Sequence, residues 1–317
     1  MMSCDFIQVP YSKKVKVSVQ GDIKDRNGKT VFITVHDVGE NGRSFIDFVD
    51  SPWMSEVKKK SVWLHVILPG QDDDDDPLPP TYNFPSLDDV AKDLAVVLDA
   101  YKVKGTVIGF GEGAGSNILL RFSLIFPNRC LGLILLDCTP TCAGVDEQLL
   151  RKMYNWRESG SKLWHKVMNT ISREKLDSKP LTRRKMNSGN VSRYLEAYLR
   201  RDDISFAIAN GLSTDLVLVC GSRSSFVQDA YHLNHLKCSR STVLILDDKT
   251  SVILEAPKNL ARALILFCKG VGILTSVPLL GLEKEFRRVQ EKGKISDKEL
   301  EMAKTIRMFE DWVDFAA

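Results

Sequence analysis

The chain has 317 residues, of which 44% are apolar and 8% aromatic, and it carries 44 Lys+Arg against 41 Asp+Glu. A chain of this length can bury a sizeable core and suits one large α/β domain with an insertion. The formal charge of +3 excludes the strongly basic balance that is typical of nucleic-acid-binding proteins.

The first residues, 1–9, contain Asp5 and lack the apolar stretch of a signal peptide, so we expect a cytoplasmic protein. Cys138 and Cys142 are spaced CxxxC, but no second Cys/His pair has zinc-site spacing, and we expect no metal and no other cofactor. The cysteines are odd in number and most lie in or beside apolar runs, which predicts reduced, buried thiols. They are Cys4, Cys130, Cys138, Cys142, Cys220, Cys238 and Cys268.

The N-terminal third predicts strands followed by a helix. Valines alternate with polar residues over 15–19, and the turn-like residues 25–28 precede the apolar run 31–35, which predicts a hairpin of two strands. A third strand is expected at 62–68, before a Pro-Gly pair. Residues 87–100 then repeat apolar side chains at helical spacing.

The same alternation continues along the chain. A strand at 105–109 leads through a Gly-rich turn into a helix at 116–126, and further strands follow at 131–136, 216–220 and 243–246. Near-continuous apolar strands that alternate with helices indicate a mostly parallel central sheet with helices on both faces.

A long polar stretch separates two of these strands. It exceeds an ordinary crossover and has helical patterns at 149–156, 164–171 and 191–199, which predicts a helical cap inserted into the sheet domain. The apolar tract 264–282 contains Lys269 and Pro278 and predicts a core helix and its exit rather than a transmembrane segment. The tail predicts an amphipathic helix from Ser296.

Five adjacent aspartates occupy residues 72–76. A run of like charges repels itself and is interpreted as a solvated loop. The run lacks the alternating ligand spacing of an EF-hand, so it does not predict a calcium site.

The most informative segment runs from Val107 to Gly115. It has the frame of the nucleophile elbow G-x-S-x-G, with Gly109 and Gly113 as the flanking glycines and Gly111 in the nucleophile's place. A central glycine tolerates the strained turn but supplies no oxygen. We therefore predict an α/β-hydrolase fold without a serine nucleophile.

The other two members of a Ser-acid-His triad are also replaced. Ser224 stands in the acid's place after the strand at 216–220, and Thr250 stands in the histidine's place before Leu254-Glu255-Ala256-Pro257. No histidine follows His235, so no C-terminal base is available. The degenerate triad positions are Gly111, Ser224 and Thr250.

Other residues could form a site around this elbow. Glu112 and Asp137 could make a two-carboxylate site, and His36 lies where hydrolases carry the oxyanion loop. The glycines also leave open a dinucleotide loop in which Ala114 replaces the third glycine. His232 and His235 share a helix face and are interpreted as surface residues. The candidate cleft-lining residues are His36, Asp37, Val38, Phe110, Glu112 and Asp137.

Several motifs together resemble the N-myc downstream-regulated gene (NDRG) family of the α/β-hydrolase superfamily. Residues 34–39 (TVHDVG) look like its T-x-H-D-[IVL]-G loop, residues 69–71 like its P-G-Q, and residues 84–88 (FPSLD) like its Y-P-S-M-D. Residues 109–115 (GFGEGAG) look like its G-[ML]-G-x-G-A-G, and Ala197 to Asp202 is similar to its A-Y-x-x-R-x-D. The polyacidic loop and the lack of a Ser/Thr-rich tail depart from this pattern.

The resemblance implies a non-enzymatic cytoplasmic protein that acts by binding, as a binding or adaptor module in signal transduction, differentiation, stress response or vesicle trafficking. It implies protein partners without naming them. Two alternatives stay open: a hydrolase or lyase with a remodelled, non-triad site, and a protein that binds a lipid or acyl ligand in the cleft under the cap.

We expect four segments. Residues 1–140 and 211–272 form the two parts of the α/β-hydrolase domain. Residues 141–210 form the helical cap, and residues 273–317 form a helical tail.

Overall fold

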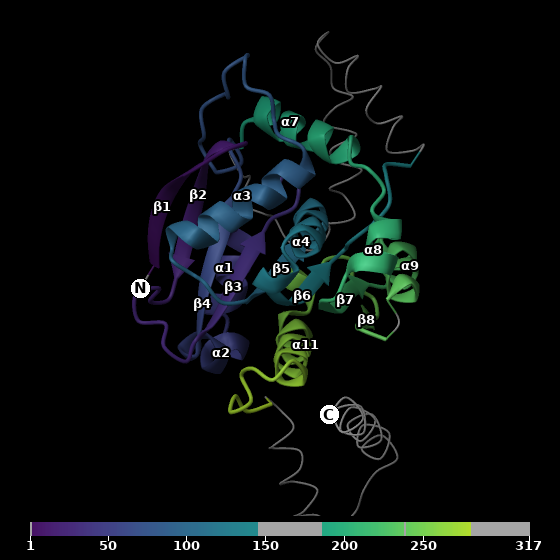
Figure 1. The fold of residues 1–317 in the computed structure, drawn as a ribbon. Helices are drawn as coiled ribbons and strands as arrows, with labels where there is room; N and C mark the ends of the chain where they lie inside the picture. Colours follow the sequence, from purple (N-terminus) through teal and green to yellow (C-terminus); the bar gives the residue numbers. More distant parts are fainter. Residues whose placement is uncertain (1, 145–185, 238, 280–317) are drawn as a thin grey trace, which may run out of the picture.

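The computed structural model describes residues 2–144, 186–237 and 239–279. Through these ranges runs an eight-stranded sheet with the strand order β1-β2-β4-β3-β5-β6-β7-β8 (Figure 1). The strands are β1 (Met2–Val9), β2 (Lys13–Gln20), β3 (Thr30–Val35), β4 (Ser61–Ile67), β5 (Val107–Glu112), β6 (Cys130–Leu136), β7 (Asp215–Gly221) and β8 (Ser241–Leu246). The neighbouring strands from β4 to β8 in this order are all parallel, whereas β2 pairs antiparallel with both β1 and β4. This confirms the predicted mostly parallel sheet.

Helices cover both faces of this sheet (Figure 1). The core on one face includes side chains of α3 (Leu87–Ala100), α4 (Ala114–Ile125), α7 (Ser188–Leu199), α8 (Ser205–Gly211) and α9 (Val227–Leu236). The core on the other face includes side chains of α1 (Arg43–Asp50), η1 (Pro52–Met54), α2 (Ser55–Lys59), α10 (Val252–Glu255) and α11 (Pro257–Gly270). A short turn, η2 (Pro127–Arg129), leads into β6. All seven residues of β4 are buried, because central strands are covered on both sides.

Local signals explain why α3 begins where the sequence predicted it. The hydroxyl of Ser86 accepts a hydrogen bond from the backbone N–H of Asp89, which caps the first turn. Asp88 and Asp89 also place negative charge at the helix N-terminus, where the helix dipole favours it. The apolar spacing over 87–100 then matches the buried face of the helix.

The predicted hairpin between the strands at 15–19 and 31–35 is wrong. β2 pairs with β1 on one side and with β4 on the other, and β4 separates β2 from β3. The tight hairpin is instead formed by β1 and β2, which pair from Met2 opposite Gln20 to Val9 opposite Lys13. β3 pairs in parallel with β4 and β5, because its largely buried residues suit the interior of the sheet.

Much of the predicted cap, 145–185, and the predicted tail helix lie outside the described residues, including the expected helices at 149–156 and 164–171. The predicted helix at 191–199 is confirmed as part of α7. α11 ends at Gly270 and buries Leu264 and Cys268 against the sheet, as the core-helix interpretation of this tract predicted. Among the helices described, none is long and apolar enough to cross a membrane.

No disulfide joins the six cysteines within the described ranges. Cys130, Cys138, Cys220 and Cys268 are buried, as predicted, but Cys4 and Cys142 are exposed. Burial raises the pKa of the Cys130 thiol to about 12 and raises that of the other three buried thiols as well, so these four groups stay protonated and unreactive near neutral pH.

Candidate functional site

The turn from β5 into α4 is centred on Gly113. β5 continues through Glu112, and Gly113 then adopts φ 54° and ψ −118°, a conformation that side chains rarely adopt. In hydrolases of this architecture the nucleophile occupies this strained strand-to-helix turn. The prediction that Gly111 takes the nucleophile's place is therefore wrong by two residues, because Gly111 lies inside the β5 ladder opposite Val35.

The glycines two positions before and after Gly113 support Gly113 as the centre of the elbow. A Cβ on Gly111 would lie 2.8 Å from the backbone nitrogen of Ser116, and a Cβ on Gly115 would overlap the carbonyl of Val35. Both positions thus need the small residues that flank a nucleophile. The elbow is Gly111-x-Gly113-x-Gly115, and its centre supplies no oxygen.

The side chain of Asp37 fills the space beside this turn. Its Oδ1 accepts hydrogen bonds from the backbone N–H groups of Val38, at 2.8 Å, and of Ala114, at 2.9 Å. A Cβ on Gly113 would overlap the same carboxyl group. The Asp37 carboxylate therefore lies where a nucleophile's side chain would begin.

Two backbone N–H groups at the turn are already paired within the protein. The N–H of Gly113 donates to the carbonyl of Leu136 at 2.9 Å, and that of Ala114 donates to Asp37. A phosphate cradle depends on such N–H groups pointing at the ligand. Their pairing does not support the dinucleotide-loop alternative.

The loop that carries Asp37 is held from two sides. His36 is fully buried, and its Nε2 accepts from the N–H of Leu68 at 3.2 Å, so the proton lies on Nδ1, which donates to the carbonyl of Asp37 at 2.8 Å. From α7, the hydroxyl of Tyr194 donates to the carbonyl of His36 at 3.1 Å. Burial, together with the nearby carboxylate of Asp37, raises the pKa of Tyr194 well above its usual value. His36 thus positions the loop.

Asp137 and Ser224 lie together at the ends of β6 and β7. Asp137 is 2% exposed and adopts φ 47°, and its Oδ1 accepts a hydrogen bond from the Ser224 hydroxyl at 2.7 Å. The N–H of Phe226 in turn donates to the Ser224 oxygen at 3.2 Å. The structure therefore joins a predicted degenerate triad position to a predicted carboxylate.

The loop after β8, which carries Thr250, lies against the loop that carries Ser224. Glu255 accepts from the backbone N–H groups of Thr250, at 3.1 Å, and Ser251, at 2.8 Å. The N–H of Arg223 donates to the carbonyl of Lys249 at 2.9 Å, which links this loop to the one carrying Ser224. Backbone hydrogen bonds thus hold Thr250, the predicted histidine position, close to the loop that carries Ser224.

Phe110 does not share this environment. Phe110 is fully buried in the other core, where its ring lies 4.9 Å from that of Phe45 and 6.2 Å from that of Trp63, which places it away from the turn. Glu112 is 4% exposed and pairs with Leu136 in the sheet. Alternate residues of a strand point to the same face, so Glu112 lies on the same face of β5 as Phe110.

A second buried histidine supports the sheet below this loop. Thr34 Oγ1 lies 2.9 Å from Nδ1 of His65, and Gln20 Oε1 lies 3.1 Å from its Nε2, while the Gln20 amide donates to Asp50 at 2.6 Å. The ring is therefore a neutral Nε2–H tautomer. Burial lowers the pKa of His65 to about 3.

The acidic loop is fastened to α7. Asn190 donates to the carbonyl of Asp76 at 2.9 Å and accepts from the N–H of Leu78 at 2.8 Å. Asp72 forms an ion pair with Lys16, so the run is partly bound rather than wholly solvated. Within the described ranges no group of three or more His, Cys, Asp or Glu side chains could hold a metal ion. His232 and His235 are exposed on α9, as predicted.

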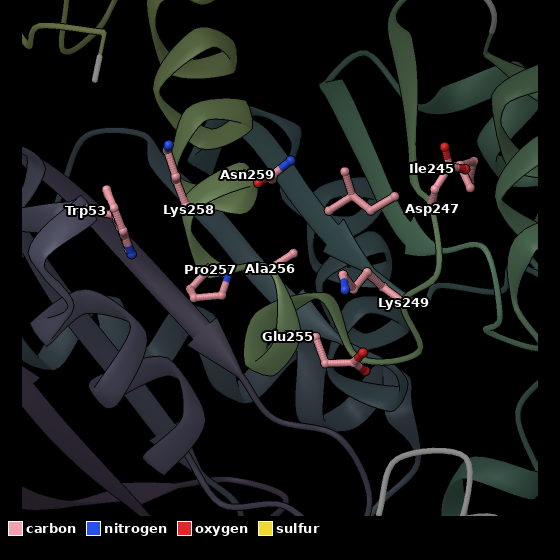
Figure 2. Close-up of a pocket in the computed structure, with 10 residues that line it drawn as sticks. Trp53, Ile245, Asp247, Lys249, Glu255, Ala256, Pro257, Lys258 and Asn259 are labelled. Atoms are coloured by element: carbon pink, nitrogen blue, oxygen red, sulfur yellow. The ribbon is translucent and has the colours of Figure 1, made fainter. Parts of the chain in front are cut away.

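A pocket of about 570 Å³ lies beside the loop of Thr250 (Figure 2). It is lined by Trp53 of η1, by Asp247 after β8 and by Lys258 at the start of α11, with the Lys258 ammonium 5.3 Å from the Trp53 ring centre. Lys249 and Glu255 also line it. The residues around Gly113 do not line this pocket, so it is separate from the elbow.

The sequence named Gly113 only as a flanking glycine of the elbow and Ala114 only as part of a dinucleotide loop, and it did not single out Tyr194. The paired small residues Gly111 and Gly115 could have indicated the correct centre of the elbow. The hydrogen bond from Ala114 to Asp37 spans 77 positions and leaves no local signal. Tyr194 lies in a helix that was predicted, but periodicity does not say which residue of the buried face reaches a given loop.

Comparison with known proteins gives one family and one fold. The sequence profile described as the Ndr family matches residues 7–275. An uncharacterized protein of Caenorhabditis elegans is 39% identical over 85% of this chain and 85% of its own length. An NDRG-like protein of Dictyostelium discoideum is 26% identical over 84% of this chain and 86% of its own length. The protein NDRG2 of Danio rerio is 28% identical over 82% of this chain and 72% of its own length.

Solved structures share the fold at low sequence identity. A thermophilic esterase from Thermogutta terrifontis matches with a TM-score of 0.64 and 15% identity, covering 85% of this chain and 99% of that one. MenH from S. aureus also matches with a TM-score of 0.64 and 14% identity, covering 86% of this chain and 99% of that one. The fold is that of the α/β-hydrolases, and at this identity the likeness carries no activity.

Proposed function

The chain belongs to the Ndr family, and from that membership we propose that it is a catalytically inactive α/β-hydrolase-fold protein that acts by binding. The observation that carries the proposal is the pairing of Gly113 with Asp37. The turn that holds a nucleophile in hydrolases has no side chain here, and the carboxylate of Asp37 occupies the adjoining space.

The surrounding groups also support a loss of acyl-transfer chemistry. A serine hydrolase needs a nucleophile within hydrogen-bond reach of a base, which a third group orients. His36 instead has both ring nitrogens hydrogen-bonded to backbone groups, and Asp137 accepts a hydrogen bond from the Ser224 hydroxyl. The degenerate triad positions are better regarded as Gly113, Ser224 and Thr250.

We propose an adaptor role in the cytoplasm, in signalling, differentiation, stress response or vesicle trafficking, with proteins as partners. Its support is the membership of the Ndr family together with the degenerate elbow. The hydrogen bonds of Asn190 and Tyr194 with loops of the sheet domain hold α7 against those loops, and we propose that α7 and the acidic loop together form the surface for a partner.

The activity test uses the purified full chain. We expect no turnover of p-nitrophenyl acetate or butyrate above the rate with bovine serum albumin, and no labelling by a fluorophosphonate probe. An esterase of the same fold serves as the positive control. Saturable turnover that disappears in Asp137→Asn but persists in the exposed-site variant Asp248→Asn would contradict the proposal and favour a remodelled site.

The binding test compares two forms of the full chain. Affinity capture from cells with wild type and with Asn190→Ala, which removes two side-chain hydrogen bonds between α7 and the acidic loop, should show partners that are specific to wild type. Direct binding of the recovered partner to purified wild type, weakened in the variant, is the expected result. Equal binding by both forms would show that this surface is not the docking site.

A further inference from the structure

The two N–H groups that hold Asp37 are those that form an oxyanion hole in hydrolases of this fold. One belongs to the residue after the nucleophile, and the other comes from the loop after β3. Here Ala114 follows Gly113 directly, and Val38 lies in the loop between β3 and α1. Both donors remain in place although the nucleophile is gone.

These donors converge on a single oxygen. The distances to Asp37 Oδ1, 2.8 Å from Val38 and 2.9 Å from Ala114, match those of donors that bind an oxyanion. Ala114 is also the first residue of the 12-residue helix α4, whose N-terminus favours a negative charge. The carboxylate therefore occupies the place of a bound anion.

The missing side chain at Gly113 is what makes room for this arrangement. A Cβ there would overlap all three atoms of the carboxyl group, so the nucleophile and Asp37 in this rotamer exclude each other. Asp37 itself is half-buried. The residue is therefore not sealed within the core.

We propose that Asp37 is a built-in carboxylate ligand that keeps a preserved oxyanion hole closed, and that the hole takes a small external carboxylate when the Asp37 side chain is removed. In the wild-type protein, a ligand with a carboxylate or another oxyanion reaches these donors only by displacing Asp37. The inference rests on the proposed function only in treating the turn as a former nucleophile site.

The test is chemical rescue of Asp37→Ala in the full chain. Formate and acetate are titrated at constant ionic strength against chloride, while the melting temperature and the amide shifts of Val38 and Ala114 are followed. We expect saturable stabilisation of Asp37→Ala by formate and shifts at these two amides. Wild type and Asp37→Asn, whose Oδ1 still accepts both hydrogen bonds, should show neither response.

Three results would overturn the proposal: no response of Asp37→Ala, an equal response to chloride, or the same response in wild type. If Asp37→Ala does not fold in chloride, the refolding yield in formate replaces the melting temperature, and equal yields in both salts would overturn it. Ester turnover by wild type would contradict the proposed function, whereas failed rescue alone would contradict only the role of Asp37.

Discussion

Replacing Gly113 with alanine tests whether the degenerate elbow is closed by Asp37. The substitution places a Cβ on a residue with φ 54° and ψ −118°, which costs about 2 kcal/mol of backbone strain. The same Cβ overlaps the Asp37 carboxyl group, which must move. Asp37 then loses two hydrogen bonds to its charged group, each worth about 1.5 kcal/mol at a half-exposed site. We expect Gly113→Ala to lower the free energy of unfolding by about 5 kcal/mol.

Two controls separate strain from displacement. Gly28 also has a positive φ, 69°, but a Cβ there would meet nothing within 4 Å, so Gly28→Ala should cost only about 1 kcal/mol. In an Asp37→Ala background the overlap is absent, and Gly113→Ala should cost only its strain of about 2 kcal/mol. Urea denaturation followed by circular dichroism measures each value. Equal costs for Gly113→Ala and Gly28→Ala, or an undiminished cost in the Asp37→Ala background, would refute the reasoning.

Three further predictions concern buried polar groups. The folded-state pKa of His65, about 3, lies below its unfolded value of about 6.5, so stability is lost as pH falls below 6.5. By pH 5 this loss of unfolding free energy is about 2 kcal/mol. His65→Gln removes the titrating group, so its unfolding free energy in urea denaturation should depend less steeply on pH. Tyr194→Phe removes the donor to the His36 carbonyl and should cost about 1 kcal/mol, and an unchanged midpoint would contradict the contact. Arg121→Met removes a buried guanidinium with three hydrogen bonds and should cost about 3 kcal/mol, whereas Arg43→Met, at an exposed pair, should cost about 0.5 kcal/mol or less.

The sequence by itself determined the alternation of strands and helices. β4, β6 and α3 are found where their patterns predicted them, because a buried strand needs a continuous apolar run and α3 carries its own cap at Ser86. The motif at residues 34–39 and the Gly-rich elbow also pointed to the family that the comparison confirms. These features are local, so they can be inferred from neighbouring residues.

Only the tertiary structure decided the pairing of strands and the register of the elbow. β2 and β3 are close in sequence, yet β4 lies between them, since pairing depends on which strands bury each other's faces. The alternating glycines from Gly109 to Gly115 fit the elbow pattern in more than one register. The β5 ladder ends at Glu112, opposite Leu136, and that non-local contact puts the turn at Gly113. Asp37 meets it only because β3 and β5 are neighbours in the sheet.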